Sequence, residues 1–449
     1  MSSSPGLLHS DVRPRELWAW AMYDFANSGY TTVVITALFN AYFVAVVASN
    51  APWATFAWTA TLAISYGLIV FSAPVVGAYA DQHAAKKRLL VITTIGCVLC
   101  TSLLYFAQPE TLYFTIICLI ASNFFFGSGE NLIAAFLPEL SRSRAMGRVS
   151  GWGWGLGYLG GLITLGLCLI YVTWAEAQGH KATQFVPITM LITAGIFALA
   201  SLPTFLLLQE RATPSATHSV QLRKAWLEVW QTLWTLRQFS DLRRFLLCSL
   251  FYQAGIQTVI TLTAIYASQA MQFTTREILL LVLVVNVTAA IGAALFGHLQ
   301  DRIGHVRAIA LTLAGWILAI LLAWSSHRAT LFWTAANLVG LCLGASQSGG
   351  RALVGLLAPP RRLAEFFGFW GLTVKLASIA GPLTYGATTW LTSGNHRLAL
   401  LLTGSYFVIG LILLSGVHLP RGRQAALRSD RLERKEIDAI QLSDFKKTF

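Results

Sequence analysis

Two short stretches of sequence indicate how the chain is organised. Residues 297–304 read GHLQDRIG, and residues 77–81 read GAYAD. An offset of 220 residues places the glycine and the aspartate of the first copy, Gly77 and Asp81, on Gly297 and Asp301 of the second. Because the same Gly-x-x-x-Asp spacing occurs in both halves of a 449-residue chain, we expect two halves related by internal repetition.

Both stretches follow long apolar runs, and such runs recur along the whole chain. The sequence is 55% apolar and only 11% charged, which excludes an ordinary soluble domain with about a quarter of its residues charged. A membrane-spanning helix needs about 20 mostly apolar residues. Twelve runs are long enough, at about 17–47, 55–80, 89–107, 111–137, 148–174, 185–208, 243–270, 277–299, 306–326, 330–357, 364–392 and 396–418. The predicted fold class is therefore an all-α polytopic membrane protein with twelve transmembrane helices.

The basic residues indicate the orientation. The formal charge is +13, and 26 of the 32 Lys and Arg fall in segments on the same side of the membrane as the N-terminus. Arg351 and Lys375 lie within spans. The opposite side holds four: Lys181, Arg276, Arg328 and Arg397. This asymmetry follows the positive-inside rule and predicts cytoplasmic N- and C-termini. The basic excess thus reflects topology, and we expect no nucleic-acid partner.

The polar interval in the middle of the chain separates six spans from six. It contains Trp226, Trp230 and Trp234 at helical spacing, flanked by the basic residues Arg223, Lys224 and Arg237. This pattern suits a helix lying among lipid headgroups, and a plain tether between the halves is an equal alternative. The predicted parts are an N-terminal six-helix bundle, a cytoplasmic linker with an amphipathic interfacial helix, a C-terminal six-helix bundle and a basic cytoplasmic tail, at 1–208, 209–242, 243–418 and 419–449.

A second correspondence relates the fourth and tenth spans. An offset of 221 residues places Gly129 on Gly350 and Glu130 on Arg351. Two pseudo-symmetric six-helix bundles are typical of carriers that work by alternating access, with the substrate site near mid-membrane where the repeats meet.

The Gly-x-x-x-Asp stretches, placed in short loops after the second and eighth spans, resemble the signature of the major facilitator superfamily. The second copy keeps the pattern better, because Gln82 and Ala84 replace the usual base and glycine of the first. The resemblance implies that a conformational motif is formed by Gly77, Asp81, Gly297, Asp301 and Arg302.

Within that superfamily the chain is similar to the bacterial "unknown major facilitator" family, related to the vacuolar amino-acid effluxers of autophagy. The similar stretches are YDFANS at 23–28, AFLPEL at 135–140, SGWGWGLGYLGG at 150–161 and AEFFGFW at 364–370. The chain departs from the family in its seventh span, where Tyr252-Gln253-Ala254 stands in place of Tyr-Asn-Asp. The missing carboxylate puts the family's coupling chemistry in question.

Four ionisable residues lie inside predicted spans: Asp24, Glu130, Arg351 and Lys375. A charge at the membrane centre costs at least about 2.5–3.5 kcal/mol, so it normally faces a partner or a wet cavity. These groups are candidates for binding a charged substrate, carrying a coupling proton or closing a cytoplasmic gate, for which Glu130 and Arg351 would pair. Alternatively each charge is paired within its own half, Glu130 with Arg148 for example.

Other polar residues of the spans are weaker candidates for substrate hydrogen bonds, or else link helices. They are Tyr23, Asn27, Tyr252, Gln253 and Gln257. In the fifth span Gly153, Gly157 and Gly161 repeat at i, i+4 spacing, which allows close helix packing.

An intramembrane enzyme would need a nucleophile with its base, or a metal site. All nine histidines fall in loops, tails or span ends, and the chain contains no His-Glu-x-x-His and no nucleotide-binding motif. We therefore expect no enzyme activity, metal or cofactor. The predicted function is secondary active transport of a small polar solute, amino acids first, by a monomer in the bacterial cytoplasmic membrane. The expected partners are substrate, lipid and a coupling proton. The alternatives are a drug or metabolite efflux pump of this fold and a membrane sensor that does not transport.

Overall fold

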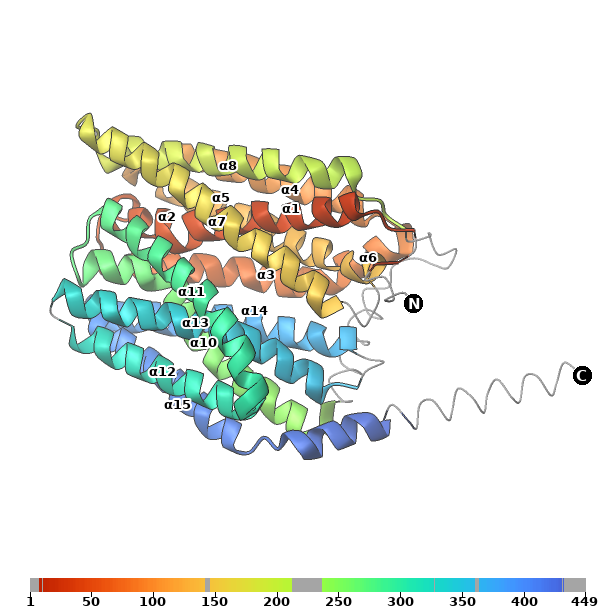
Figure 1. The fold of residues 1–449 in the computed structure, drawn as a ribbon. Coiled ribbons are helices and arrows are strands. Elements are labelled where there is room, and N and C mark those ends of the chain that lie inside the picture. The colour runs from red at the N-terminus through yellow and green to blue at the C-terminus, as the bar shows by residue number, and fades with distance from the viewer. Residues whose placement is uncertain are drawn as a thin grey trace, which may run out of the picture. The chain divides into compact units, whose positions relative to one another are not determined.

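The computed structural model describes residues 8–9, 11–141, 146–211, 236–326, 328–359, 363–429 and 431. In these residues it has twelve helical segments long and apolar enough to cross a membrane, and no β-strand (Figure 1). The prediction of an all-α polytopic fold is thus confirmed. The helix predicted around Trp226–Trp234 and most of the basic tail lie outside the described residues.

Within each half, the helices follow one another with short connections. Those of the first half are α1 (Pro14–Tyr30), α2 (Phe39–Tyr42), α3 (Ala54–His83), α4 (Lys86–Leu103), α5 (Leu112–Ala134), α6 (Leu137–Leu140), α7 (Met146–Ala177) and α8 (Ala182–Leu207). Those of the second half are α10 (Ser240–Gln269), α11 (Thr275–Ile303), α12 (His305–Ser325), α13 (Ala329–Leu357), α14 (Leu363–Leu391) and α15 (His396–Ser415), followed by a short helix at 419–429.

The first span is not one continuous α-helix. Between α1 and α2 the chain forms a π-helix at Thr31–Ala37, and after α2 a second one at Phe43–Val47. Leu38, at the junction, has a backbone outside the helical region, with φ −123° and ψ −59°. π-helical turns are rare and occur frequently at functional sites. The two π-helices therefore mark the first span as a candidate functional element.

Packing divides the chain into two compact units. Unit 1 comprises Met1–Trp226, Gln257–Asn286 and Ile379–Leu400, and unit 2 comprises Leu227–Ile256, Val287–Ser378 and Leu401–Phe449. The division passes through α10, α11 and α14, so part of each of these helices belongs with the first-half helices. Within unit 1, α1 packs on α7 and α8, and α5 on α3 and α4; within unit 2, α12 packs on α13. That residues 1–208 and 243–418 form two independent six-helix domains stays a prediction.

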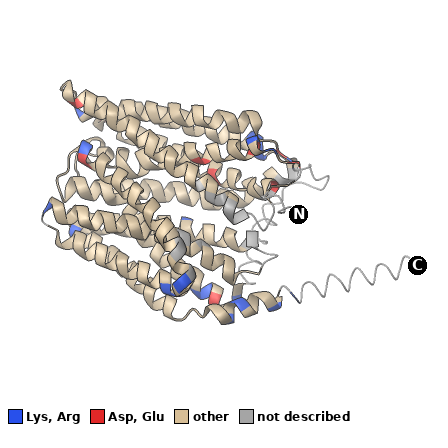
Figure 2. Ribbon diagram, viewed as in Figure 1, with Lys and Arg blue, Asp and Glu red and all other residues tan. Residues whose placement is uncertain are grey.

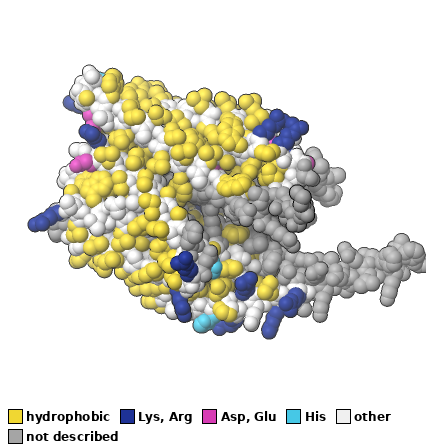
Figure 3. All heavy atoms as spheres, viewed as in Figure 1, with side chains coloured by type: hydrophobic (Ala, Val, Ile, Leu, Met, Phe, Trp, Pro, Cys, Tyr) yellow, Lys and Arg dark blue, Asp and Glu magenta, His cyan; other side chains and the backbone are white. Residues whose placement is uncertain are grey.

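The distribution of polarity suits lipid. Large apolar side chains such as Ile117, Ile170 and Leu199 are exposed, whereas Asn40 and Gln253 are buried. Most charged residues lie near helix ends (Figure 2), and hydrophobic side chains cover much of the face seen in Figure 3. Water would penalise such a surface, but a hydrocarbon solvent favours it. The chain is therefore an integral, multi-pass membrane protein.

The structure corrects one local expectation. Residues 77–81 and 297–301 do not lie in loops, because α3 continues to His83 and α11 to Ile303. A helix satisfies its own backbone hydrogen bonds and can continue past the apolar stretch. The turns come later, at Ala84 with φ +47° and at Gly304 with φ +90°.

Candidate functional site

Tyr23, on α1, is anchored inside unit 1. Its side chain is 1% exposed, and its hydroxyl hydrogen-bonds with Thr94 Oγ1 of α4 at 2.8 Å. Phe197 of α8 meets the ring edge-on, with centroids 5.9 Å apart. A Cβ at Gly129 of α5 would lie 2.6 Å from the Tyr23 oxygen, so only glycine leaves room for it. Tyr23, which the sequence suggested as a residue that hydrogen-bonds the substrate, thus lies in the interior of unit 1, where it joins α1 to three other helices.

The next residue, Asp24, faces α7. A Cβ at Gly153 would collide with its carboxylate oxygen Oδ2, and a Cβ at Gly157 would lie 2.9 Å from Ser28 Oγ. At Gly161 the nearest atom is Thr32 Oγ1, at 2.8 Å. The glycines predicted to allow close helix packing therefore contact α1, and one of them makes the space that Asp24 occupies.

Glu130 follows directly on Gly129, so the anchoring of Tyr23 also brings the two predicted acids into one region of unit 1. Glu130 is half-buried. The side chains of Arg148 and Arg351 lie outside the described residues, and pairing of Glu130 with either of them stays a prediction.

Asn27, one turn beyond Asp24, is a buried amide with unused hydrogen-bonding capacity. It is 7% exposed, and neither its nitrogen nor its oxygen has a partner among the described residues. Buried polar groups are nearly always paired, and each unpaired one costs about 1–3 kcal/mol. Such a group is typical of a site that is completed by a ligand or water.

Unit 2 repeats the anchoring of a tyrosine on a glycine. A Cβ at Gly350 of α13 would lie 2.7 Å from the hydroxyl of Tyr252 on α10. The Ser249 hydroxyl also donates to that oxygen, at 3.4 Å. The two tyrosines thus have equivalent places in the two halves, each followed by a polar residue: Asp24 in the first and Gln253 in the second.

Gln253 has the same unused capacity as Asn27. Its side chain is 0% exposed, and neither amide atom has a partner in the part of the chain that the structure describes. On α10, the Cys248 thiol donates to the Gly410 carbonyl, and Gly255 lies against the ring of Phe407, so this face of the helix packs on α15. At 100° per residue, Gln253 lies about 140° around the helix from Cys248. Its amide therefore faces away from α15.

The other predicted residues have the following places. Gln257 is half-buried one turn beyond Gln253, and Lys375 is half-buried near the middle of α14. Arg302 is exposed at the end of α11. For four other predicted residues the structure describes the helical backbone only: Asp81, Gly297, Asp301 and Arg351.

Gly77 lines a small cavity of about 80 Å³ in unit 1. Its walls are residues of α3 and α5, among them Ser72 and Asn131, together with Lys86. Lys86 Nζ donates to Glu139 Oε1 at 3.0 Å. The cavity therefore ends at a charge pair rather than at an unpaired cation.

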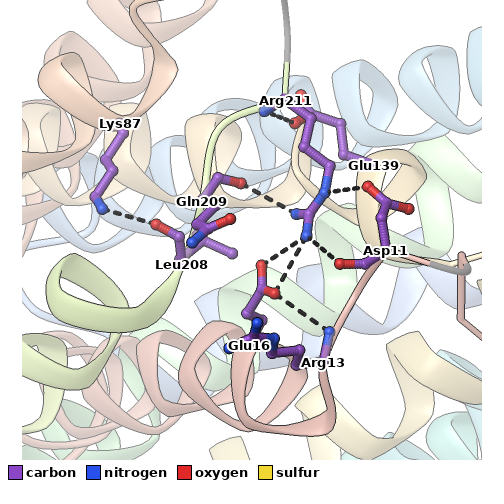
Figure 4. A network of polar contacts seen from close by, with 8 residues as sticks. All are labelled: Asp11, Arg13, Glu16, Lys87, Glu139, Leu208, Gln209 and Arg211. Carbon is purple, nitrogen blue, oxygen red and sulfur yellow. Dashed lines mark hydrogen bonds and ion pairs between the residues drawn. The ribbon is translucent and has the colours of Figure 1, made fainter.

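Glu139 belongs to a larger network of charges at this end of unit 1 (Figure 4). The main-chain N–H of Arg211 donates to Glu139 Oε2 at 3.0 Å, and its guanidinium donates to Asp11 at 2.7 Å and to Glu16 at 2.9 Å. Glu210 accepts the first two N–H groups of α4, from Lys86 and Lys87, and so caps that helix.

The electrostatic consequences are clearest at Asp11 and Arg211. The hydrogen bond from Arg211 lowers the pKa of the Asp11 carboxyl below its usual 3.8. Burial lowers the pKa of Arg211, but the bonds to Asp11 and Glu16 outweigh it and the pKa is raised overall. Through these contacts Arg211, in the segment after α8, is bound to Asp11 and Glu16 at the start of the first span.

Unit 2 has a counterpart of this contact. Arg421, after the last span, donates two hydrogen bonds of 2.7 Å to Asp241 at the start of α10. Asp241 also accepts the N–H of His418 at 3.0 Å. In both halves, therefore, an arginine that follows the sixth span is bound to an acid at the beginning of the first.

Sequence reasoning missed these pairs because it counted end charges for topology only. It also missed Asn40, a fully buried amide of the first span. Polar residues inside an apolar run were the available signal in that case. Among the described residues, no group of three or more His, Cys, Asp and Glu could hold a metal ion.

Comparison with known proteins now defines the class. The fold is similar to that of the nucleoside transporter NupG, with a TM-score of 0.66 over 90% of this chain and 98% of that one, at 14% identity. The twelve candidate spans and this likeness define the fold as that of the major facilitator type.

The family is defined by sequence. The family described as "Vacuole effluxer Atg22 like" matches residues 54–427, and the chain belongs to it. It is 28% identical to the uncharacterized MFS-type transporter YxiO of Bacillus subtilis, over 89% of this chain and 94% of that protein. It is 27% identical to autophagy-related protein 22 of Cryptococcus neoformans, over 67% of this chain and 58% of that protein. The resemblance to the superfamily and to the effluxers is thereby confirmed.

Proposed function

We propose that this chain is a secondary active transporter that moves a small polar solute, an amino acid in the first instance, across the cytoplasmic membrane of a bacterium by alternating access. Membership of an effluxer family is the observation that carries the proposal. The amino acid is what the resemblance to the vacuolar effluxers of autophagy implies.

The polar groups of the first and seventh spans support a polar substrate. Asn27 and Gln253 each bury a complete amide whose donor and acceptor have no partner in the described part of the chain. A solute that carries both donors and acceptors, as amino acids do, satisfies such groups better than an apolar drug does. In the proposal Asp24 and Glu130 carry the coupling proton, because an intramembrane carboxylate is a typical element of a proton relay.

The test is solute flux in proteoliposomes that contain the purified full chain. Exchange of labelled amino acids, peptides, sugars and nucleosides is compared with and without a pH gradient. Asp24→Asn or Glu130→Gln should abolish transport driven by the gradient but leave exchange. The matched control is Glu176→Gln, which removes an exposed acid at the end of α7.

Each alternative has its own outcome. Flux of apolar drugs without flux of amino acids would favour an efflux pump, and saturable binding without any flux would favour a sensor. Unchanged pH dependence in both carboxylate variants would refute the proton coupling. The proposed orientation has a separate test: a reporter at residues 179–181 should be external and one at residues 86–88 cytoplasmic.

A further inference from the structure

One end of unit 1 is closed by contacts between residues far apart in the sequence. This distal end carries the turns at 48–53 and 270–274. Here the Gln269 amide donates to Asn50 Oδ1 at 2.7 Å, and Phe56 stacks on Trp390 with ring centroids 4.9 Å apart. The second span is also in contact with α14, because a Cβ at Gly386 would lie 3.0 Å from Phe56 Cα.

Asn40 is the most deeply buried polar group of this closure, at 0% exposure. Its Nδ2 donates to the Thr36 carbonyl at 3.0 Å and to the Thr261 carbonyl of α10 at 2.9 Å. Its Oδ1 accepts the N–H of Ala41 at 2.8 Å. Both N–H donors and the carbonyl oxygen of the side chain are therefore used.

The bond to Thr261 distinguishes Asn40 from Asn286 and Asn337, whereas Asn123 also bonds to a second helix, through the Ser65 hydroxyl at 3.0 Å. Asn286 and Asn337 also donate to the carbonyl four residues earlier, at 2.8 Å in each case. Among the described residues, neither of these two side chains donates to a second helix as Asn40 does. The acceptor at Thr261 is a main-chain carbonyl, so the contact depends on the position of α10 and not on the side chain at 261.

The backbone around Asn40 is the least regular of the first span. The four residues of α2 that contain it lie between the π-helices Thr31–Ala37 and Phe43–Val47. In a π-helix the hydrogen bonds are shifted by one residue from the α pattern, and bends in helices commonly occur at such places. The side chain that reaches α10 thus lies between two points at which the span can bend.

We propose that Asn40 is the positioning residue that latches the distal end, and that the flanking π-helices are the hinges about which the first span bends when this end opens. The inference rests on the proposed alternating access, which requires that each end opens in turn. A bond made only in the closed state shifts the equilibrium by its differential free energy. Once α10 moves away, one Asn40 N–H must find water instead of Thr261.

The test follows opening with a cysteine reporter. Thr59 is 1% exposed and lies against Gly386, so Thr59→Cys should react with a membrane-impermeant maleimide only when the distal end is open. The protein is the purified full chain in nanodiscs, with its six native cysteines replaced. Asn40→Ala should label about fivefold faster, as expected for the loss of one buried hydrogen bond of typical net strength.

Matched variants separate the latch from general damage. Asn337→Ala removes a bond of the same type within one helix, and Thr261→Ala leaves the acceptor carbonyl in place; both should label at the parental rate. Asn40→Asp keeps the shape of the side chain and its acceptor but loses the donors, and it should behave like Asn40→Ala. It takes the place of that variant if Asn40→Ala does not fold.

The outcomes for the latch and for transport are distinct. If the Asn40 variants label no faster than Asn337→Ala, the latch is refuted, whatever flux is measured. If they label faster but no solute in the panel is moved, the latch stands and the proposed transport fails. Faster labelling of Thr261→Ala would also refute the assigned main-chain bond.

Discussion

Gly160→Ala adds one methyl group where α7 touches the backbone of α1. A Cβ at this position would lie 2.7 Å from Phe25 Cα and still nearer to the Phe25 carbonyl oxygen, whereas ordinary contacts lie at 3.4–4 Å. Backbone atoms cannot rotate away, so the two helices must separate by roughly 1 Å. Overpacking of this kind costs about 1–3 kcal/mol.

Gly166→Ala is the matched control on the same helix, because a Cβ there meets nothing within 4 Å. Both variants gain up to about 1 kcal/mol of helix propensity from the change of Gly to Ala. Their difference in stability therefore isolates the cost of the α1–α7 contact. With about 2–4 °C per kcal/mol for a unit of this size, Gly160→Ala should melt roughly 2–12 °C below Gly166→Ala.

The measurement is the thermal unfolding of both variants and the parent in the same detergent, followed by tryptophan fluorescence. Gly166→Ala should melt at or slightly above the parent and Gly160→Ala below it. Equal melting temperatures for the two variants would show that α1 and α7 do not approach as closely as described. The placement of Asp24 between α1 and α7 would then be wrong as well.

Three further predictions concern the ends of the helices. Ala84→Gly should raise stability by roughly 0.5–1 kcal/mol because Ala84 has φ +47°, and Gly304→Ala, at φ +90°, should lower it by at least 1 kcal/mol; calorimetry of both variants checks the opposite signs. Arg211→Ala should cost about 2 kcal/mol in a denaturant titration, because it leaves Glu16, 3% exposed, without its cation; this is below the usual 3–5 kcal/mol because Arg211 itself is 20% exposed. The lowered pKa of Asp11 means that its bond to Arg211 stabilises above pH 3.8 and is lost as the pH falls below it, so the difference in melting temperature between the parent and Asp11→Asn should shrink from pH 5 to pH 3.

The spans themselves could be predicted because lipid selects apolar runs of fixed length, a local property of the sequence. The close packing of α7 was also readable from its spaced glycines, but the sequence did not show that its partner is α1. The bond from Asn40 to Thr261 was not readable, since it joins residues 221 positions apart and a main-chain acceptor leaves no mark on the sequence. The continuation of α3 through Asp81 to His83 was missed for a related reason: hydropathy records where the membrane ends, not where the helix ends.

The two halves share a tyrosine–glycine packing contact but differ in the polar residues next to it. Tyr23 and Tyr252 are each seated on a glycine of the fourth span of their own half. The residue after the tyrosine is Asp24 in one half and Gln253 in the other, and the residue after the glycine is Glu130 in one and Arg351 in the other. A tyrosine against a bare glycine backbone fixes how two helices approach, and such a contact tolerates little change in volume. A neighbouring position lies about 100° around the helix from that contact and is free to differ. Within each half, therefore, the tyrosine and the glycine set how the helices pack, and the residues that follow them are the positions at which the two halves differ in charge.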